Sequence, residues 1–237
     1  MCEKIKILYE DADILVCVKP AGTASETRKS GEQDMVSLLR NYRHGRGEEP
    51  YAGLVHRLDQ PVEGILVFGK HARSTSALSR QLARGGFSKI YLAVTEKAMP
   101  QQEGRLVDFL KKDSRSNTSF VAAQGEAQAK KAELLYQVLE TQARQERVQN
   151  LVRIELLTRR HHQIRVQMAH LGTPLAGDLK YGRQETASRG TQAAGPALCA
   201  CGLEFLHPAS RKKMKFHICP SQPVFQKFDY ICGMRGI

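Results

Sequence analysis

The amino-acid sequence predicts an α+β domain built on a largely antiparallel, mixed sheet. Short β-rich runs recur along the chain, only three segments show helical spacing, and the order of the two kinds does not follow a regular βαβ alternation. The 237 residues suit one domain, or one domain with a modest subdomain, and are enough to bury a substantial core. We therefore expect residues 1–237 to form a single domain.

The expected strands follow from runs of β-branched and aromatic residues. They are Ile5–Tyr9, Asp13–Val18, Ile65–Phe68, Ile90–Val94, Ala132–Leu139, Leu151–Leu157, Leu203–Phe205 and Met214–Ile218. Apolar residues three or four apart predict helices within 35–42, 77–82 and 164–171. Residues 22–34 and 182–197 lack periodicity and are expected to be mobile surface loops, and polar residues 112–130 are expected to form a further excursion.

The charge balance favours a polyanionic partner. The chain carries 36 Lys and Arg against 24 Asp and Glu, a formal net charge of +12, and its sequence pI is about 9.6. Nucleic acid is therefore the leading candidate partner. A binding protein without activity would share this charge, so charge alone does not separate an enzyme from a binding module.

The N-terminal residues lack a signal-peptide pattern, and no apolar run approaches the roughly 18 residues that cross a bilayer. These features predict a soluble, cytoplasmic protein without a membrane partner. The six cysteines are scattered, which is typical of reduced thiols. A zinc site built from Cys199, Cys201, His217 and Cys219 is an alternative that we disfavour, because Cys-x-Cys lacks the usual two-residue ligand loop.

The segment 55–70, Val-His-Arg-Leu-Asp-Gln-Pro-Val-Glu-Gly-Ile-Leu-Val-Phe-Gly-Lys, places Asp59 among basic residues just before an apolar strand. Neighbouring cations such as Arg57 are expected to keep this carboxylate ionised, and so able to act as a nucleophile or base. The alternative interpretation is an ordinary turn, since Asp before Gln-Pro is common in loops.

A second dense motif lies at 156–182, where Thr-Arg-Arg-His-His-Gln-Ile-Arg-Val-Gln opens a predicted helix and Gly-Asp-Leu-Lys-Tyr-Gly closes the segment. Further blocks stand at 14–22, 89–94, 130–139 and 197–208. Together these ordered blocks closely resemble the RluA-type family of RNA pseudouridine synthases over nearly the whole chain. The resemblance implies the pseudouridine synthase fold, a long mixed sheet with a central active-site cleft.

The resemblance also implies catalytic roles. Asp59 occupies the position of the catalytic carboxylate, Arg165 that of the arginine which pairs with it, and Tyr91 that of the tyrosine beneath the target base. Taken without the resemblance, Arg165 could contact phosphate and Tyr91 could be a sheet residue. Glu63 is the only other nearby acid, and we expect it to be solvated. The reaction needs no cofactor and no metal.

RNA contacts are expected from basic and polar residues near both motifs. Arg57 could fill the space that a flipped-out uridine vacates, or it could be structural. The RNA-binding candidates are His56, Arg57, Arg160, His162, Gln163, Lys212 and Lys213. The basic clusters at 159–162 and 211–215 are expected to contact the RNA backbone. The alternative interpretation is that each cluster is only a solvated basic face.

Three positions depart from the family pattern. Gln60 replaces a common Arg, and Val62 a common Thr. Arg159 stands where Gly is usual, which would strain the backbone if that position needs positive φ.

Two functional hypotheses remain. The first is a monomeric pseudouridine synthase that acts on uridine in rRNA or tRNA, without the basic N-terminal RNA-binding module of many relatives. The second is a non-catalytic RNA-binding or ribosome-assembly protein on the same fold. Joint retention of Asp59, Tyr91 and Arg165 favours the first, because binding to a polyanion does not require a carboxylate.

Overall fold

The computed structural model describes residues 5–27, 29, 31–144, 147–182 and 195–234. They form two compact units, which are described separately. The first comprises residues 1–89 and 200–218, and the second residues 90–199 and 219–237. No helix in the described part of the chain is both long and apolar enough to cross a membrane.

The first unit is built around two fully buried strands. Strands β2 (Ile14–Lys19) and β4 (Glu63–Gly69) pair antiparallel. In sheet order β1 (Lys6–Glu10) precedes β2, and β10 (Leu198–Leu206) follows β4. The short β3 (Gly53–Leu54) pairs with β4, and β11 (Lys213–His217) forms a hairpin with β10. The runs of β-branched residues in the two central strands suit burial on both faces.

The close approach of β4 and β10 depends on Gly64. Its φ is +156°, and a Cβ atom built there would lie 2.4 Å from the Cβ atom of Ala200. Any larger residue would push the two strands apart. Gly64 follows the Asp59 motif directly, so the same segment that carries the candidate carboxylate also fixes how the strand after it packs.

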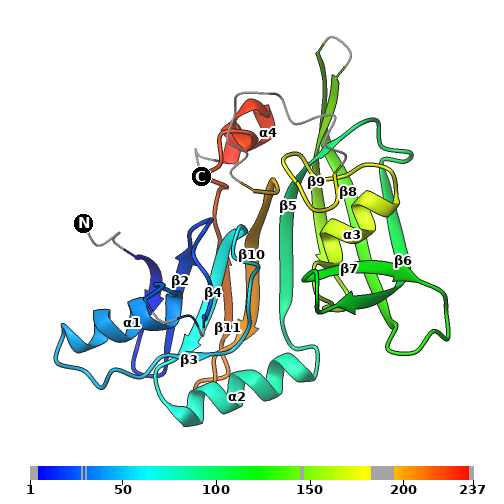
Figure 1. The fold of residues 1–237 in the computed structure, drawn as a ribbon. Coiled ribbons are helices and arrows are strands. Elements are labelled where there is room, and N and C mark those ends of the chain that lie inside the picture. Colours follow the sequence, from blue (N-terminus) through cyan, green and yellow to red (C-terminus); the bar gives the residue numbers. More distant parts are fainter. Residues whose placement is uncertain (1–4, 28, 30, 145–146, 183–194, 235–237) are drawn as a thin grey trace. The chain divides into compact units, whose positions relative to one another are not determined.

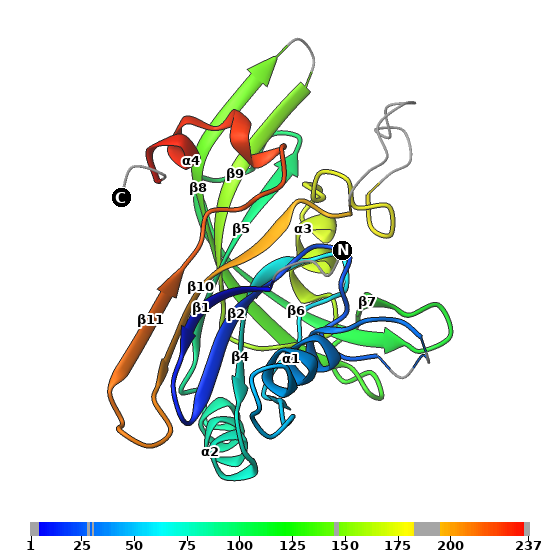
Figure 2. The same ribbon diagram turned by 90° about the vertical axis from the view of Figure 1, so that its left-hand side faces the viewer.

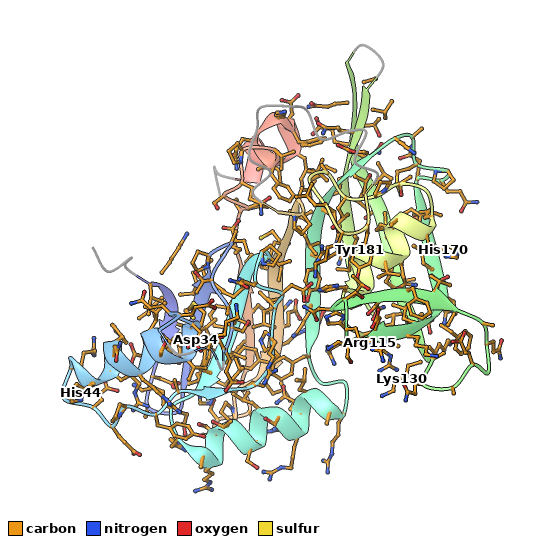
Figure 3. All side chains as sticks on the ribbon, viewed as in Figure 1. Asp34, His44, Arg115, Lys130, His170 and Tyr181 are labelled. Carbon is orange, nitrogen blue, oxygen red and sulfur yellow. The ribbon has the colours of Figure 1, made fainter. Side chains whose placement is uncertain are left out.

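Two helices belong to this unit (Figures 1 and 2). Helix α1 (Met35–His44) begins with a capping box, in which Asp34 accepts a hydrogen bond from the Ser37 N–H and Ser37 accepts one from the Asp34 N–H. Figure 3 labels Asp34 and His44 at its two ends. Helix α2 (Ala72–Ala83) is capped by His71, whose Nδ1 accepts the Ser74 N–H.

The second unit is an antiparallel sheet with helix α3 (Gln163–His170) on one face (Figure 1). Its strand order is β5 (Ser88–Glu96), β9 (Arg147–Leu156), β8 (Lys130–Arg144), β6 (Glu103–Asp113) and β7 (Thr118–Ala122). Helix α3 packs on this sheet, where Val166 joins a buried cluster with Leu110 and Ala132. A 3-10 turn (Phe225–Lys227) and α4 (Asp229–Met234) follow β11 in the chain.

The α+β class is confirmed, and all eight predicted strands and three predicted helices occur with shifted bounds. The expectation of an excursion over 112–130 is wrong, because this stretch holds the end of β6, all of β7 and the first residue of β8. Loop 22–34 has no regular element among its described residues. Most of the predicted loop 182–197, namely 183–194, lies outside the described residues.

Candidate active site

Asp59 lies half-buried in the turn that leads into β4. Its carbonyl oxygen accepts a hydrogen bond from the Val62 N–H at 2.9 Å, which closes a four-residue turn around Gln60 and Pro61. The turn interpretation and the catalytic interpretation of the sequence are therefore compatible. The local structure is a turn, and it presents an ionisable carboxylate that is neither fully exposed nor sequestered.

The side chain of buried Lys19 binds the backbone of this turn. The Lys19 Nζ atom donates to the carbonyl oxygens of Pro20, Thr23 and Gln60 at 2.9, 2.6 and 2.9 Å. Burial lowers the pKa of Lys19 to about 8, while Coulomb attraction by Asp59 and Glu63 acts in the opposite direction. Lys19 therefore fixes the backbone of the turn and also places a cation in the field of the candidate carboxylate.

Ser25 holds the residue just before Asp59. Its hydroxyl donates to the Leu58 carbonyl oxygen and accepts the Leu58 N–H, each at 3.0 Å. Both backbone polar groups of Leu58 are thus satisfied by one side chain in a buried position. Sequence reasoning missed Ser25 because it lies in an aperiodic stretch.

His56 and Arg57 have different environments. Arg57 is exposed and donates to Glu26 at 2.7 Å. His56 is buried, with its ring edge-on to Phe87 at 6.0 Å, and both Arg57 and His56 line a cavity of about 460 Å³. The exposure of Arg57 suits an RNA contact, whereas His56 is buried against Phe87. RNA binding by either residue stays a prediction.

The expectation of a solvated Glu63 is wrong. Glu63 is 5% exposed at the start of β4, one residue before Gly64, which pairs with Lys19. A carboxylate buried at this point lies in the field of the Lys19 ammonium, which favours its charged form.

Tyr91 is buried on β5 in the second unit. It pairs across the sheet with Ile154, which pairs with Tyr136 of β8, so the three side chains point to one face. Ala132 shares that face by strand alternation and contacts Val166 of α3 within the buried cluster. Tyr91 and the helix that carries Arg165 therefore lie on the same face of this sheet.

Arg165 forms a buried, bidentate ion pair with Asp178. Its Nε and Nη2 atoms donate to the two carboxylate oxygens at 2.7 and 2.6 Å, and the side chain of Asp178 is fully buried. The guanidinium carbon also lies 5.1 Å from the ring centre of Tyr181. Pairing of Arg165 with Asp59 stays a prediction. Sequence reasoning assigned no role to Asp178 or Tyr181, although both lie in the second motif.

Two neighbouring histidines, His161 and His162, lie near Tyr181, which Figure 3 labels. The Tyr181 hydroxyl accepts the Ser119 N–H at 2.8 Å, and its oxygen lies within hydrogen-bond distance of His162 Nδ1, at 2.6 Å. The rings of His161 and His162 stack at 3.7 Å. Desolvation, with repulsion from nearby cations including Arg165, lowers the pKa of His161 to about 4 and of His162 to about 3. Both imidazoles are therefore neutral near pH 7.

The strained backbone position of this segment is His162, with φ of 54°, and not Arg159. The concern that Arg159 would occupy a position needing positive φ is therefore wrong. The left-handed residue instead precedes the first turn of α3, where the hydrogen bond to Tyr181 and the stacked ring of His161 hold its side chain.

Gln163 is buried and Arg160 is exposed, as are His56 and Arg57 respectively. Gln163 is buried, donates to the Glu133 carbonyl oxygen at 3.1 Å and accepts the Arg160 N–H at 3.0 Å. Arg160 is exposed, and its Nε donates to the Lys131 carbonyl oxygen at 2.9 Å. RNA contacts by His162, Gln163 and Arg160 stay predictions. Arg160 has the exposure that such a contact needs.

The two candidate RNA-binding lysines, Lys212 and Lys213, lie at the β10–β11 hairpin. Lys213 forms an ion pair with Glu204 at 2.8 Å, while Lys212 is exposed in the turn. Their binding to RNA also stays a prediction.

Asp11, Asp13 and His207 form the group in the described part of the chain whose ligand atoms come close enough to suit a metal, within 4.8 Å of one another. His207 Nε2 contacts Asp11 at 2.8 Å, and its Nδ1 accepts the N–H groups of the following turn. Asp13 in turn contacts His71 at 2.9 Å. Hydrogen bonds within the protein thus explain this group.

Comparison with known proteins gives consistent results. The family model described as RNA pseudouridylate synthase matches residues 13–170. The chain is 34% identical over 180 residues to the uncharacterized RNA pseudouridine synthase YhcT of Bacillus subtilis, covering 76% of this chain and 58% of that protein. It is also 34% identical over 215 residues to ribosomal large subunit pseudouridine synthase C of Salmonella typhimurium, covering 88% of this chain and 64% of that protein. The chain thus spans about three fifths of the length of these relatives.

Solved structures agree on the fold. Human RNA pseudouridylate synthase domain containing 1 matches with a TM-score of 0.77 at 22% identity, over 98% of this chain and 89% of that one. Human RNA pseudouridylate synthase domain containing 4 matches with a TM-score of 0.74 at 21% identity, over 93% and 90%. The fold is therefore the pseudouridine synthase fold, as expected from the sequence. With the matched family model and the ordered motifs around Asp59 and Arg165, the chain belongs to the RluA-type family of RNA pseudouridine synthases.

Proposed function

We propose that this protein is an RNA pseudouridine synthase that isomerises uridine in rRNA or tRNA, with Asp59 as the catalytic carboxylate. The observation that carries the proposal is the position of Asp59 within the family motif, half-buried in a turn that Lys19 and Ser25 hold at both sides. A protein that only binds a polyanion gains nothing from a carboxylate presented in this way.

The reaction detaches uracil from C1′ of its ribose, turns the base and rejoins it through C5. Asp59 either attacks C1′ or removes the 2′ proton, and both routes require the ionised carboxylate that a neighbouring ammonium favours. Tyr91 would stack beneath the base and assist proton removal at C5. Arg165 would pair with Asp59 and fix its orientation.

The names of the relatives support rRNA as the substrate class, since several are described as ribosomal large subunit pseudouridine synthases. The net charge of +12 suits either rRNA or tRNA. The proposed enzyme acts as a cytoplasmic monomer and requires neither cofactor nor metal.

The test is pseudouridine mapping in total RNA from cells with and without the gene, combined with Asp59→Asn. The substitution removes the charge and keeps the shape, so product formation should be lost while RNA binding survives. Glu103→Gln, an exposed acid-to-amide change on β6, is the matched control and should retain activity. Wild-type protein that binds RNA but leaves every uridine unmodified would instead support the non-catalytic alternative. Turnover by Asp59→Asn close to that of the wild type would refute the catalytic role of Asp59.

A further inference from the structure

The first unit contains a second cavity, of about 400 Å³, that shares no lining residue with the cavity of His56 and Arg57. It lies between α2 and the segment that joins β10 to β11. Its lining residues are Ala77, Arg80, Gln81, Arg84, Gly86, Leu206, Pro208 and Arg211. Three of these are arginines and none is acidic, which sets this cavity apart from the one that Glu26 lines.

The three arginines have no carboxylate within ion-pair distance in the described part of the chain. Arg80 donates to the hydroxyl of Ser76 at 3.0 Å, which leaves its charge uncompensated. Elsewhere in the same unit, Arg57 pairs with Glu26 and Lys213 with Glu204. Cations collected around one hollow without a counter-charge favour an anionic occupant.

The helix side of the cavity is built by sequence spacing. Ala77, Arg80 and Gln81 share one face of α2, and Arg84, the C-cap residue, follows Ala77 by seven positions and so lies at the end of the same face. Gln81 binds both backbone groups of Leu206: it donates to the carbonyl oxygen at 3.0 Å and accepts the N–H at 2.7 Å. This pair of bonds fixes the helix against the end of β10 and holds Arg80 and Arg84 beside it.

The end of α2 fixes Arg84. The Gly85 N–H donates to the Leu82 carbonyl oxygen at 3.2 Å, and the Gly86 N–H to that of Gln81 at 2.9 Å. With Gly85 at φ of +77°, these bonds form a Schellman motif that ends α2 with Arg84 as its C-cap residue. The negative end of the helix dipole favours a cation at this position.

The opposite side of the cavity is equally constrained. Arg211 has φ of 59°, a conformation that non-glycine residues rarely adopt. The Arg211 N–H donates to the His207 carbonyl oxygen at 3.1 Å, and the His207 N–H donates to that of Lys212 at 2.8 Å. The buried His207 side chain further accepts the N–H groups of Ala209 and Ser210 at 3.3 and 3.1 Å. A strained arginine in a turn held this firmly is a feature typical of binding sites.

We propose that this cavity binds a phosphodiester of the RNA, with its adjoining nucleoside, at a point away from the target uridine. Guanidinium groups match phosphate oxygens with two parallel hydrogen bonds, and three arginines line this cavity from two parts of the unit. The apolar floor of Ala77, Leu206 and Pro208 suits a ribose or base face, and the volume exceeds what a phosphate alone needs. The inference rests on the proposed function only in taking RNA as the ligand.

The test is equilibrium binding of a fluorescein-labelled fragment of large-subunit rRNA, measured by anisotropy over a range of salt concentrations. Arg84→Ala and Arg211→Ala should each weaken binding and lower the slope of log K against log salt by about 0.7 to 0.9 for a lost phosphate contact. Arg73→Ala is the matched control, because Arg73 is exposed on the same helix but does not line the cavity. Arg73→Ala should lower RNA affinity and the salt slope less than Arg84→Ala or Arg211→Ala does.

The double variant Arg84→Ala with Arg211→Ala should weaken binding by less than the product of the two single effects, because both arginines would contact one phosphate. Arg84→Lys and Arg211→Lys keep the charge and should retain the salt slope, which also shows that the site folds. Single variants that behave as Arg73→Ala does, or single effects that multiply fully in the double variant, would overturn the proposal.

Binding is measured in the Asp59→Asn background, so the result does not depend on turnover. Arginine-dependent binding without pseudouridine formation by the wild type would refute the proposed function and leave this site standing. Pseudouridine formation by the wild type, together with RNA binding that does not depend on Arg84 or Arg211, would refute this site and leave the proposed function standing.

Discussion

Arg165 and Asp178 face each other edge to edge, with both carboxylate oxygens of Asp178 accepting from one side of the guanidinium. Asp178 is 13 residues further along the chain and is completely buried, and its Oδ1 also accepts the Lys180 N–H at 3.0 Å. A planar group held by two parallel bonds cannot rotate about its axis. Asp178 therefore fixes the orientation of the Arg165 guanidinium plane.

Replacing Asp178 by Asn should therefore destabilise the protein and lower its activity. Removing one partner of a buried ion pair leaves the other charge uncompensated and typically costs about 3 kcal/mol or more. Denaturant unfolding measures the stability change. Glu155→Gln is the control, since its pair with Arg153 is half-exposed and 3.5 Å long, and should cost about 0.5 kcal/mol or less. Equal effects of the two substitutions would contradict the structural role of Asp178.

The neutral His162 predicts a loss of stability in mild acid. In the unfolded chain the imidazole has a pKa of about 6.5, whereas burial and nearby cations lower it to about 3 in the folded protein. The unfolded state therefore binds more protons between these values, so the free energy of unfolding falls as the pH falls below about 6.5. From pH 7 to pH 5 His162 alone should contribute a loss of about 2 kcal/mol.

Denaturant midpoints at several pH values measure this loss. His162→Asn is the informative variant, because Asn tolerates the left-handed backbone at this position. It should unfold with a shallower dependence on pH below 6.5 than the wild type. A pH dependence as steep as that of the wild type would mean that other groups dominate.

Tyr91→Phe separates the ring from the hydroxyl. The aromatic face remains, so RNA affinity should change little, while product formation should slow if the hydroxyl assists proton removal at C5. Single-turnover rates at saturating enzyme, measured beside binding, distinguish the two effects. Unchanged rates would show that Tyr91 contributes its ring alone.

Arg57→Ala tests the role of an exposed arginine beside the candidate carboxylate. If Arg57 supports a flipped-out uridine, the variant should lower turnover more than affinity. Glu26→Gln is a useful companion, since it removes the 2.7 Å ion pair of Arg57 and keeps the arginine. A variant with a shallower salt slope and an unchanged single-turnover rate would make Arg57 a phosphate anchor.

The strands that the sequence indicates most directly are β2 and β4, whose burial on both faces produces apolar runs. Strand β6 escaped prediction because charged residues occupy many of its positions and its pairing with β8 rests largely on backbone register. Helix α4 has six residues, fewer than two turns, and is too short to show a period.

Some residues of the candidate site could be predicted from the sequence and others could not. Asp59, Tyr91 and Arg165 are recognisable from motifs, whereas Ser25 and Asp178 act through contacts 33 and 13 residues away in sequence. Lys19 lies within the sequence block at 14–22, yet its contact with the Gln60 carbonyl oxygen depends on how the chain turns at Gln60. Contacts that form only in the folded chain leave no periodic signal in sequence.

The burial of Lys19 also makes it a chemical reporter. Amine acylation requires a solvent-accessible, uncharged amine, and the Lys19 side chain reaches solvent only when its three carbonyl contacts break. A brief pulse of acetic anhydride should therefore label exposed Lys29 at once and Lys19 only as often as the turn opens. The acylation rate of Lys19, measured by mass spectrometry, therefore reports how often the turn that carries Asp59 opens.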